Sequence, residues 1–239
     1  MTAATPPRPR AAHPVARPAA VVFDMDGLIL DTEPLAARAW TEAATALGIE
    51  FDSAVTLRLV GRNIKDCAAL IRAHHGDDYP VQALAGAWQG AYDAVVARDG
   101  LVLKPGLLEL LEWLDEERIP KAVATSTRGA RARAKLARTG IVDRFAAIVG
   151  GDEIARGKPA PDIYLEAALR LAVDATACIA LEDSDPGMTA ALDAGMTAIM
   201  VPDLAIPSPA LLARQPLVLA SLHHVRAHLA ALPAAAPVR

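Results

Sequence analysis

The chain has 239 residues and a formal net charge of −4, with 53% hydrophobic and 22% charged residues. Such a length suits one large domain, or a domain with an inserted module, and the apolar content is sufficient for a substantial core. The slightly acidic balance argues against a nucleic-acid or acidic membrane partner. No apolar run reaches the length that crosses a bilayer, so we expect no membrane partner.

The cysteines and the two ends of the chain indicate the setting in which it works. Cys67 and Cys178 lie in apolar periodic segments and are predicted to be buried free thiols, which fits a reducing cytoplasm. Residues 1–18 are rich in Pro, Ala and Arg, which predicts a disordered leader, with a transit peptide as the weaker alternative. Residues 231–239 are expected to form a flexible tail, and a monomer is the default expectation.

The first expected element is a buried strand, because the apolar run Ala19–Phe23 contains β-branched residues. Residues 35–100 then show helical periodicity and no strand-like run. The helices expected there are Leu35–Leu47, Ser53–Leu59, Ile64–His74 and Val81–Arg98. We expect this segment to be an all-helical cap that is inserted after the first strand and acts as a lid.

From Lys104 onward, strand-like runs and amphipathic segments alternate. The expected strands are Ala122–Thr125, Ala146–Val149, Cys178–Leu181, Thr197–Val201 and Leu217–Leu219. The expected helices are Pro105–Glu117, Gly129–Arg138, Ile163–Leu171, Pro186–Ala194 and Leu222–Leu229. Such alternation predicts parallel strands with right-handed crossovers. The predicted fold class is α/β: a doubly wound, Rossmann-like parallel-sheet core at 19–34 and 101–230, with the helical cap at 35–100.

The most informative polar residues directly follow the first strand. Asp24 and Asp26 flank Met25 and precede Gly27, at the carboxyl edge where open α/β sheets bind ligands. A carboxylate there can act as a nucleophile, and a second one can transfer protons. Because two neighbouring acids repel each other, a cation is expected beside them. Taken alone, Asp-x-Asp-Gly fits a polar turn equally well.

Three later positions add chemistry at other strand and loop ends. Thr125, followed by Ser126, ends the second core strand, where a hydroxyl and backbone N–H groups suit an anion. Lys158 lies between Gly and Pro in a stiff loop, as a phosphate clamp requires. Glu182 and Asp183 end a buried strand and offer the hard oxygen ligands that Mg²⁺ prefers. Turn chemistry, a solvated lysine and a capped helix start are the ordinary alternatives for these positions.

Together, the order strand-Asp-x-Asp, strand-Thr, loop-Lys and strand-Glu-Asp resembles the four motifs of the haloacid dehalogenase (HAD) superfamily. The resemblance extends from about Ala19 to Leu229. The run Asp31–Pro34 and the helical segment after it resemble the branch with a small helical cap. That branch includes phosphoglycolate phosphatase, sugar-phosphate phosphatases, pseudouridine-5′-phosphatase and β-phosphoglucomutase.

The resemblance implies a role for each residue that matches a motif. Asp24 would form an aspartyl-phosphate, and Asp26 would protonate the leaving oxygen and then activate water. The implied phosphate-binding residues are Gly27, Thr125, Ser126 and Lys158. The implied Mg²⁺ ligands are Asp24, Asp26 through its backbone carbonyl, Asp183 and, through water or as a supporting acid, Glu182. The expected cofactor is therefore Mg²⁺, and the expected partner is a small phosphorylated metabolite.

The same resemblance distinguishes a phosphatase from a mutase. β-Phosphoglucomutases carry a histidine shortly after the Asp-Thr motif and an arginine just beyond a cap glycine. These positions align with Ala36 and, reading Gly61 as the glycine, with Ile64. Both functional side chains would be absent, which favours phosphate-ester hydrolysis and leaves the mutase as the alternative. Arg62 and Asn63 are the candidate substrate-binding residues of the cap. A binding module without turnover is a third hypothesis, which the intact motif residues argue against.

Overall fold

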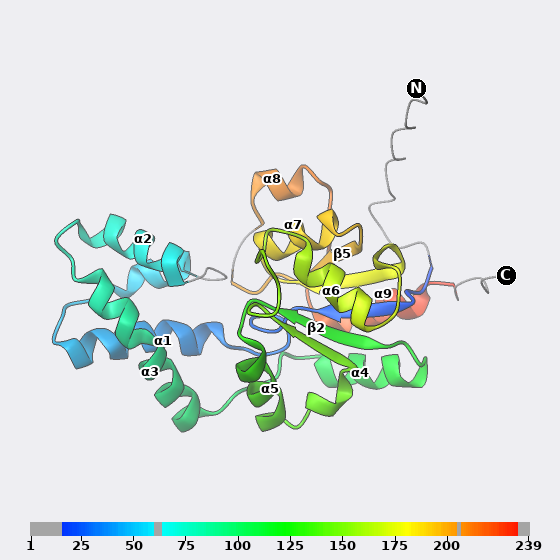
Figure 1. Ribbon diagram of the computed structural model, residues 1–239, viewed down its shortest axis with the longest axis horizontal. Helices are drawn as coiled ribbons and strands as arrows, with labels where there is room; N and C mark the ends of the chain where they lie inside the picture. Colours follow the sequence, from blue (N-terminus) through cyan, green and yellow to red (C-terminus); the bar gives the residue numbers. More distant parts are fainter. Residues whose placement is uncertain (1–15, 60–63, 205–206, 234–239) are drawn as a thin grey trace.

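The computed structural model describes residues 16–59, 64–204 and 207–233. Its centre is a six-stranded sheet in which all neighbouring strands are parallel, in the order β3-β2-β1-β4-β5-β6 (Figure 1). The strands are β1 (Ala20–Phe23), β2 (Lys121–Thr125), β3 (Ala147–Gly150), β4 (Cys178–Glu182), β5 (Thr197–Met200) and β6 (Leu217–Val218). The winding direction reverses at β1, so the carboxyl ends of β2, β1 and β4 lie next to one another at the switch point where such sheets bind ligands.

Helices cover both faces of the sheet because alternate residues of each buried strand point to opposite sides. The core helices are α4 (Leu107–Glu116), α5 (Gly129–Arg138), α6 (Asp162–Arg170), α7 (Asp185–Asp193), α8 (Pro209–Leu212) and α9 (Leu222–Ala231). Val21 and Phe23 pack with α4, α5 and α9 on one face. Ala20 and Val22 pack with α6 and α7 on the other. The predicted doubly wound α/β core is confirmed.

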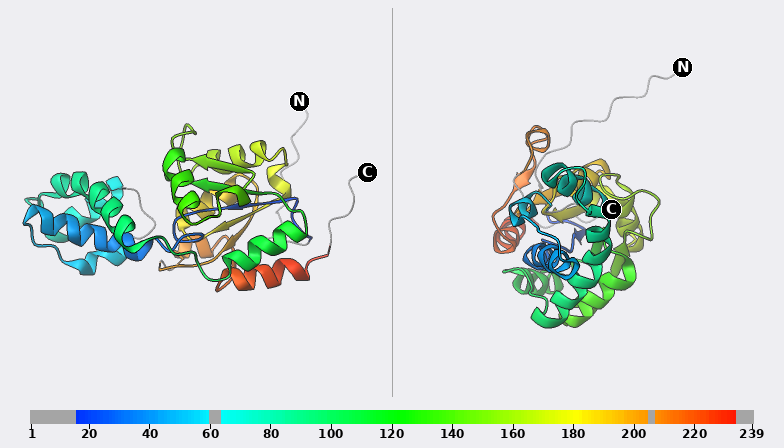
Figure 2. Two further views of the ribbon diagram at one scale, coloured as in Figure 1. Left: turned by 90° about the horizontal axis from the view of Figure 1, so that it is seen from below. Right: turned by 90° about the vertical axis from the view of Figure 1, so that its left-hand side faces the viewer.

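Four helical segments between β1 and α4 form a separate unit beside the sheet (Figures 1 and 2). They are α1 (Glu33–Leu47), the 3-10 helix Ser53–Arg58, α2 (Ile64–His75) and α3 (Val81–Asp99). Buried side chains from all four segments form an apolar core. The two connecting segments run side by side, because Asp31 N–H donates to Val102 O and Lys104 N–H donates to Ile29 O, each at 2.9 Å. This inserted helical unit agrees with the predicted fold class.

The expected elements agree with the observed ones to within about two residues at each end, apart from the short elements. The segment Ser53–Arg58 is a 3-10 helix, and β6 has only two residues. Helix α8 and the 3-10 helices Val142–Arg144 and Ala175–Ala177 were not predicted, because helices of three or four residues are too short to show a hydrophobic period. The division into core and cap at residues 34/35 and 100/101 stays a prediction.

The two ends of the described chain contact each other. Arg17, which lies inside the predicted leader, donates from its backbone N–H to Pro233 O at 2.9 Å and from Nε to Leu232 O at 3.2 Å. Arg17 of the predicted leader and Pro233 of the predicted tail are thus in contact, and the boundaries of both segments stay a prediction. Among the helices of the described ranges, none combines the length and hydrophobicity needed to cross a membrane.

Leu111→Ala is expected to lower the free energy of unfolding by about 2–5 kcal/mol, because it opens a cavity in the layer beneath β1. The Leu111 side chain is fully buried in α4. Leu108, on the same helix, is 44% exposed, so Leu108→Ala is the matched control and is expected to change stability by less than about 0.5 kcal/mol. Urea denaturation measures both variants, and equal losses would contradict this packing.

Candidate active site

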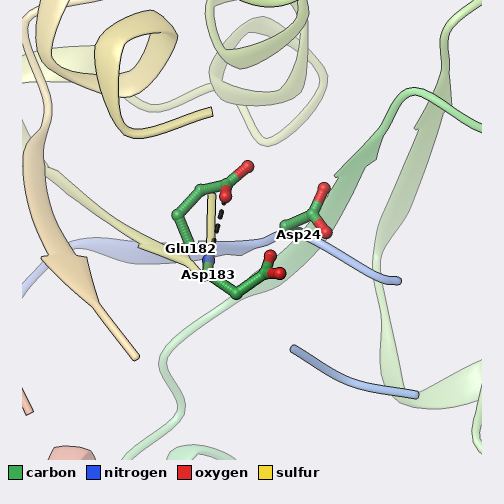
Figure 3. Close-up of side chains that lie close together, drawn as sticks. All are labelled: Asp24, Glu182 and Asp183. Atoms are coloured by element: carbon green, nitrogen blue, oxygen red, sulfur yellow. Dashed lines mark hydrogen bonds between the residues drawn. The ribbon is translucent and has the colours of Figure 1, made fainter. Parts of the chain in front are cut away.

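Three buried acids gather where β1 and β4 end. Asp24 directly follows β1, Glu182 is the last residue of β4, and Asp183 comes next (Figure 3). Each residue offers a carboxylate oxygen, and these oxygens lie within 4.8 Å of one another. They meet because β1 and β4 are parallel neighbours, with Phe23 paired to Leu181. The predicted first and last acidic motifs therefore form one cluster.

Lys158 joins two of these acids from the loop between β3 and α6. Its Nζ donates to Asp24 Oδ1 and to Glu182 Oε1, each at 2.5 Å, and its side chain is 6% exposed. The ring of Tyr164 lies 5.1 Å from the ammonium. Burial acts to lower the pKa of Lys158. The negative charges of Asp24 and Glu182 outweigh this effect, and the pKa lies well above its usual value. The predicted loop lysine is thus a buried cation at the site.

Glu182 is held by donors to both of its oxygens. Oε1 also accepts from the Tyr164 hydroxyl at 3.0 Å, while Oε2 accepts from Asp183 N at 2.9 Å and from the N and Oγ of Ser184 at 2.8 and 2.9 Å. A Cβ at Gly187 would lie 1.6 Å from Oε1, so only glycine leaves room for this carboxylate. Both oxygens of Glu182 are thus engaged, and Oε1 also accepts from Lys158.

The charge balance of the cluster favours a bound cation. Burial raises the pKa of Asp24 to about 7, with Glu182 and Asp26 adding to the effect and Lys158 opposing it. Burial also raises the pKa of Asp183 well above its usual value, helped by Glu182 and Asp24. One ammonium does not balance three neighbouring carboxylates, whereas a divalent cation with oxygen ligands would. The residues therefore fit a metal site.

The second motif acid, Asp26, makes different contacts. Its Oδ2 accepts from Thr127 Oγ1 at 2.7 Å, and its Oδ1 accepts from Lys135 Nζ at 2.6 Å. Burial acts to raise the pKa of Asp26. The Lys135 ammonium and the Thr127 hydroxyl act in the opposite direction, and the pKa lies below its usual value. The two acids of the motif thus have opposite environments: burial prevails at Asp24, whereas at Asp26 the ion pair and the hydrogen bonds together outweigh it.

The remaining core positions of the predicted site line the same edge. Thr125 is buried at the end of β2, and its Oγ1 accepts from Thr127 N–H at 3.1 Å. Ser126 follows it and is exposed. Gly27 has a φ of 93°, and a Cβ there would lie 2.3 Å from Asp183 Oδ2. Of the predicted phosphate-binding residues, Lys158 and Gly27 therefore lie directly against the acids, while Thr125 and Ser126 lie at the end of the neighbouring strand β2.

The two predicted substrate-binding residues of the cap do not belong to the described part of the chain. Arg62 and Asn63, with Gly61, lie outside the described residues. Ala36 lies on α1, where its carbonyl accepts from Trp88 Nε1 at 3.3 Å, and Ile64 begins α2 with 43% of its surface exposed. The substrate-binding role of Arg62 and Asn63 stays a prediction.

Four residues at the site were not assigned a role from the sequence. Thr127, Lys135, Tyr164 and Ser184 each contact one of the motif acids. Lysine is scarce in this sequence, with five in the whole chain, and this scarcity could have drawn attention to Lys135 as a candidate site residue. Its helical neighbourhood is rich in arginine, however, and such a segment ordinarily faces solvent.

Comparison with known proteins agrees with this geometry. A family model for haloacid dehalogenase-like hydrolases matches residues 18–195, and the chain belongs to that family. It is 36% identical over 185 residues to the fructose-1-phosphate phosphatase YqaB of Escherichia coli K12, covering 77% of this chain and 97% of the relative. It is 35% identical over 188 residues to the β-phosphoglucomutase of Bacillus subtilis, covering 76% and 82%.

A solved structure shows the same fold. The crystal structure of CbbY from Rhodobacter sphaeroides in complex with phosphate superposes with a TM-score of 0.74 at 29% identity, covering 89% of this chain and 99% of that one. The predicted superfamily, fold class and enzyme class, a HAD-type hydrolase of phosphoric monoesters, are confirmed.

Gly27→Ala is expected to weaken divalent-cation binding by at least about tenfold, because the added Cβ displaces the Asp183 carboxylate. Gly48→Ala is the matched control: Gly48 also has a positive φ, of 66°, but an added Cβ meets no atom within 4 Å. Both variants are expected to lose about 1–2 kcal/mol of stability from the left-handed backbone. Calorimetric titration with the cation measures the difference, and equal affinities would contradict the proposed placement of Asp183.

Proposed function

We propose that the protein is a Mg²⁺-dependent phosphatase of small phosphorylated metabolites, with sugar phosphates as the first candidates, and that it works through an aspartyl-phosphate. The observation that carries the proposal is the buried cluster of Asp24, Glu182 and Asp183, with Lys158 inserted between two of its acids. The sugar-phosphate candidates rest on the similarity to the fructose-1-phosphate phosphatase and to the phosphorylated carbohydrates phosphatase of Thermotoga maritima.

In the proposed first step, an Asp24 carboxylate oxygen attacks phosphorus and the bond from phosphorus to the ester oxygen breaks. Asp26, which the ion pair with Lys135 keeps ionised beforehand, takes up the proton that accompanies the phosphate monoester into the site and gives it to the departing oxygen, so that the product is an alcohol and Asp24 carries the phosphoryl group. In this proposal, Lys158 and the Thr125 hydroxyl contact phosphate oxygens. Their charge and hydrogen bonds reduce the repulsion between a dianion and a carboxylate.

In the proposed second step, water attacks the phosphoryl group on Asp24. Asp26 takes the proton from this water, the phosphorus–Asp24 bond breaks to release phosphate, and the proton passes to that phosphate, which returns Asp26 to its ionised state. Asp24, Asp183 and the backbone carbonyl of Asp26 would hold Mg²⁺, which supplies charge neutralisation for the phosphoryl oxygens when bound. Glu182 supports the site by holding Lys158 in place.

The helical unit of α1, the 3-10 helix, α2 and α3 is proposed to be a cap over this site. It is attached through only two adjacent connecting segments, an arrangement that permits hinge movement. Closure would exclude bulk water while Asp24 attacks. Arg62 and Asn63 remain the proposed cap residues that contact substrate.

A mutase is the second candidate, supported by the similarity to the Bacillus subtilis β-phosphoglucomutase. A mutase must return its phosphoryl group to a sugar rather than to water. The positions that align with the mutase histidine and arginine carry Ala36 and Ile64, which favours the phosphatase. Conversion of glucose 1-phosphate to glucose 6-phosphate, with a bisphosphate primer, faster than phosphate release would reverse this assignment.

Asp24→Asn is expected to reduce phosphate release by at least about a thousandfold, because the amide is a poor nucleophile. The assay is phosphate release from a panel of phosphorylated metabolites, including fructose 1-phosphate, with and without Mg²⁺. Asp193→Asn is the control, since Asp193 is a half-exposed residue on α7 that pairs with Arg214. Release that persists in Asp24→Asn, or that is independent of Mg²⁺ after chelation, would contradict the proposal.

The affinity for Mg²⁺ is expected to fall by at least about tenfold for each pH unit below 7, because the cation then displaces a proton from Asp24. The metal-free Asp24 carboxyl, with a pKa of about 7, is mostly protonated in acid, and the raised pKa of Asp183 adds to the loss of affinity. Calorimetric titration across about pH 5.5–8 measures the profile. Asp24→Asn should make the profile shallower, because the cation then displaces one proton fewer. A flat profile in the wild type would contradict the environment assigned to Asp24.

A further inference from the structure

The face of α5 that meets the cap helix α3 carries three basic residues one turn apart. Arg131 forms an ion pair with Asp93, and Arg138 Nη2 donates to Val96 O at 3.2 Å. Lys135 lies between them along the helix, with its ammonium 5.0 Å from the centre of the Tyr92 ring. These long side chains of α5 therefore reach across to α3. Two of the three residues thus serve as docking contacts between core and cap.

Lys135 differs from its two neighbours because it also contacts the motif acid. Its Nζ donates to Asp26 Oδ1 at 2.6 Å, and its side chain is only 12% exposed. Tyr92, whose ring lies 5.0 Å from the same ammonium, is only 4% exposed. A buried lysine is stabilised by a carboxylate and by an aromatic face. Lys135 is therefore held from the core by Asp26 and from the cap by Tyr92.

We propose that Lys135 is a positioning residue that ties the carboxylate of Asp26 to cap helix α3, so that the orientation of Asp26 depends on where the cap lies. While Tyr92 covers the ammonium, water is kept from the ion pair and the carboxylate is fixed between Lys135 and Thr127. Movement of α3 away from α5 uncovers the ammonium, which then gains water and holds Asp26 less firmly. This inference rests on the proposed function, in which Asp26 transfers the proton.

The dependence on the leaving group distinguishes positioning from simple cap docking. Departure of a sugar alkoxide needs the proton of Asp26, whereas 4-nitrophenolate leaves readily without one. A misplaced Asp26 therefore lowers kcat/KM for a sugar phosphate more than kcat/KM for 4-nitrophenyl phosphate. A loosened cap without that defect lowers both values together.

The experiment measures kcat/KM for fructose 1-phosphate, or for the sugar phosphate that the panel selects, and for 4-nitrophenyl phosphate. Lys135→Met is expected to lower the ratio of the two values by about tenfold. Tyr92→Leu, which keeps Lys135 and Asp26, is expected to lower it by about threefold. Arg131→Met is the matched control, because it removes a docking contact from the same face and should leave the ratio unchanged.

Each outcome decides the inference. An unchanged ratio in Lys135→Met, or an equal change in Arg131→Met, would reduce Lys135 to a docking contact. If Lys135→Met does not fold, as thermal denaturation would reveal, Tyr92→Leu decides: a ratio equal to that of the wild type overturns the link to the cap. A wild type that releases phosphate from neither substrate would instead overturn the proposed function, a failure separate from the others.

Discussion

The rest of the site depends on the ion pairs that the buried Lys158 ammonium makes with two carboxylates. It contacts Asp24 and Glu182 at 2.5 Å from a loop that follows β3. An unpaired charge in this position would cost several kcal/mol, so the surroundings are constrained to supply partners. Glu182 keeps its position through the Tyr164 hydroxyl, two backbone N–H groups and the Ser184 hydroxyl. Lys158 thereby also holds the carboxylate of Asp24 at the carboxyl end of β1.

The sheet topology brings these groups together. Because β1 lies between β2 and β4, the residues that follow these three strands converge without any long loop. The opposite environments of Asp24 and Asp26 then divide the chemistry. Burial and neighbouring acids act on Asp24, which favours a bound cation, while an ion pair to Lys135 holds Asp26 towards the helical unit. In the proposed function, this short motif thus contributes both to the metal site and, through Lys135, to the link with helix α3.

Much of this arrangement is predictable from the sequence, for local reasons. Asp24 and Asp183 follow apolar β-branched or aliphatic runs whose strand character is clear, and Lys158 is restricted by its Gly and Pro neighbours. The fold class follows from alternation of strands and helices. The roles of Lys135 and Tyr92 could not be predicted, because their contact joins helices from two parts of the fold and depends on how α5 packs against α3. The need for glycine at position 187 could not be predicted for the same reason. Only the packing of Glu182 against Gly187 shows that a Cβ would not fit there.

The central claim is that Asp24 is the nucleophile of the cluster, and its most direct test is to trap the phosphorylated protein. Wild-type protein would be mixed with substrate and Mg²⁺, quenched in acid within the first turnover, and digested for mass spectrometry of its peptides. The account predicts a phosphoryl group on Asp24, formed at a rate no slower than phosphate release. A phosphoryl group on any other residue, or none on Asp24 while phosphate is released rapidly, would contradict it.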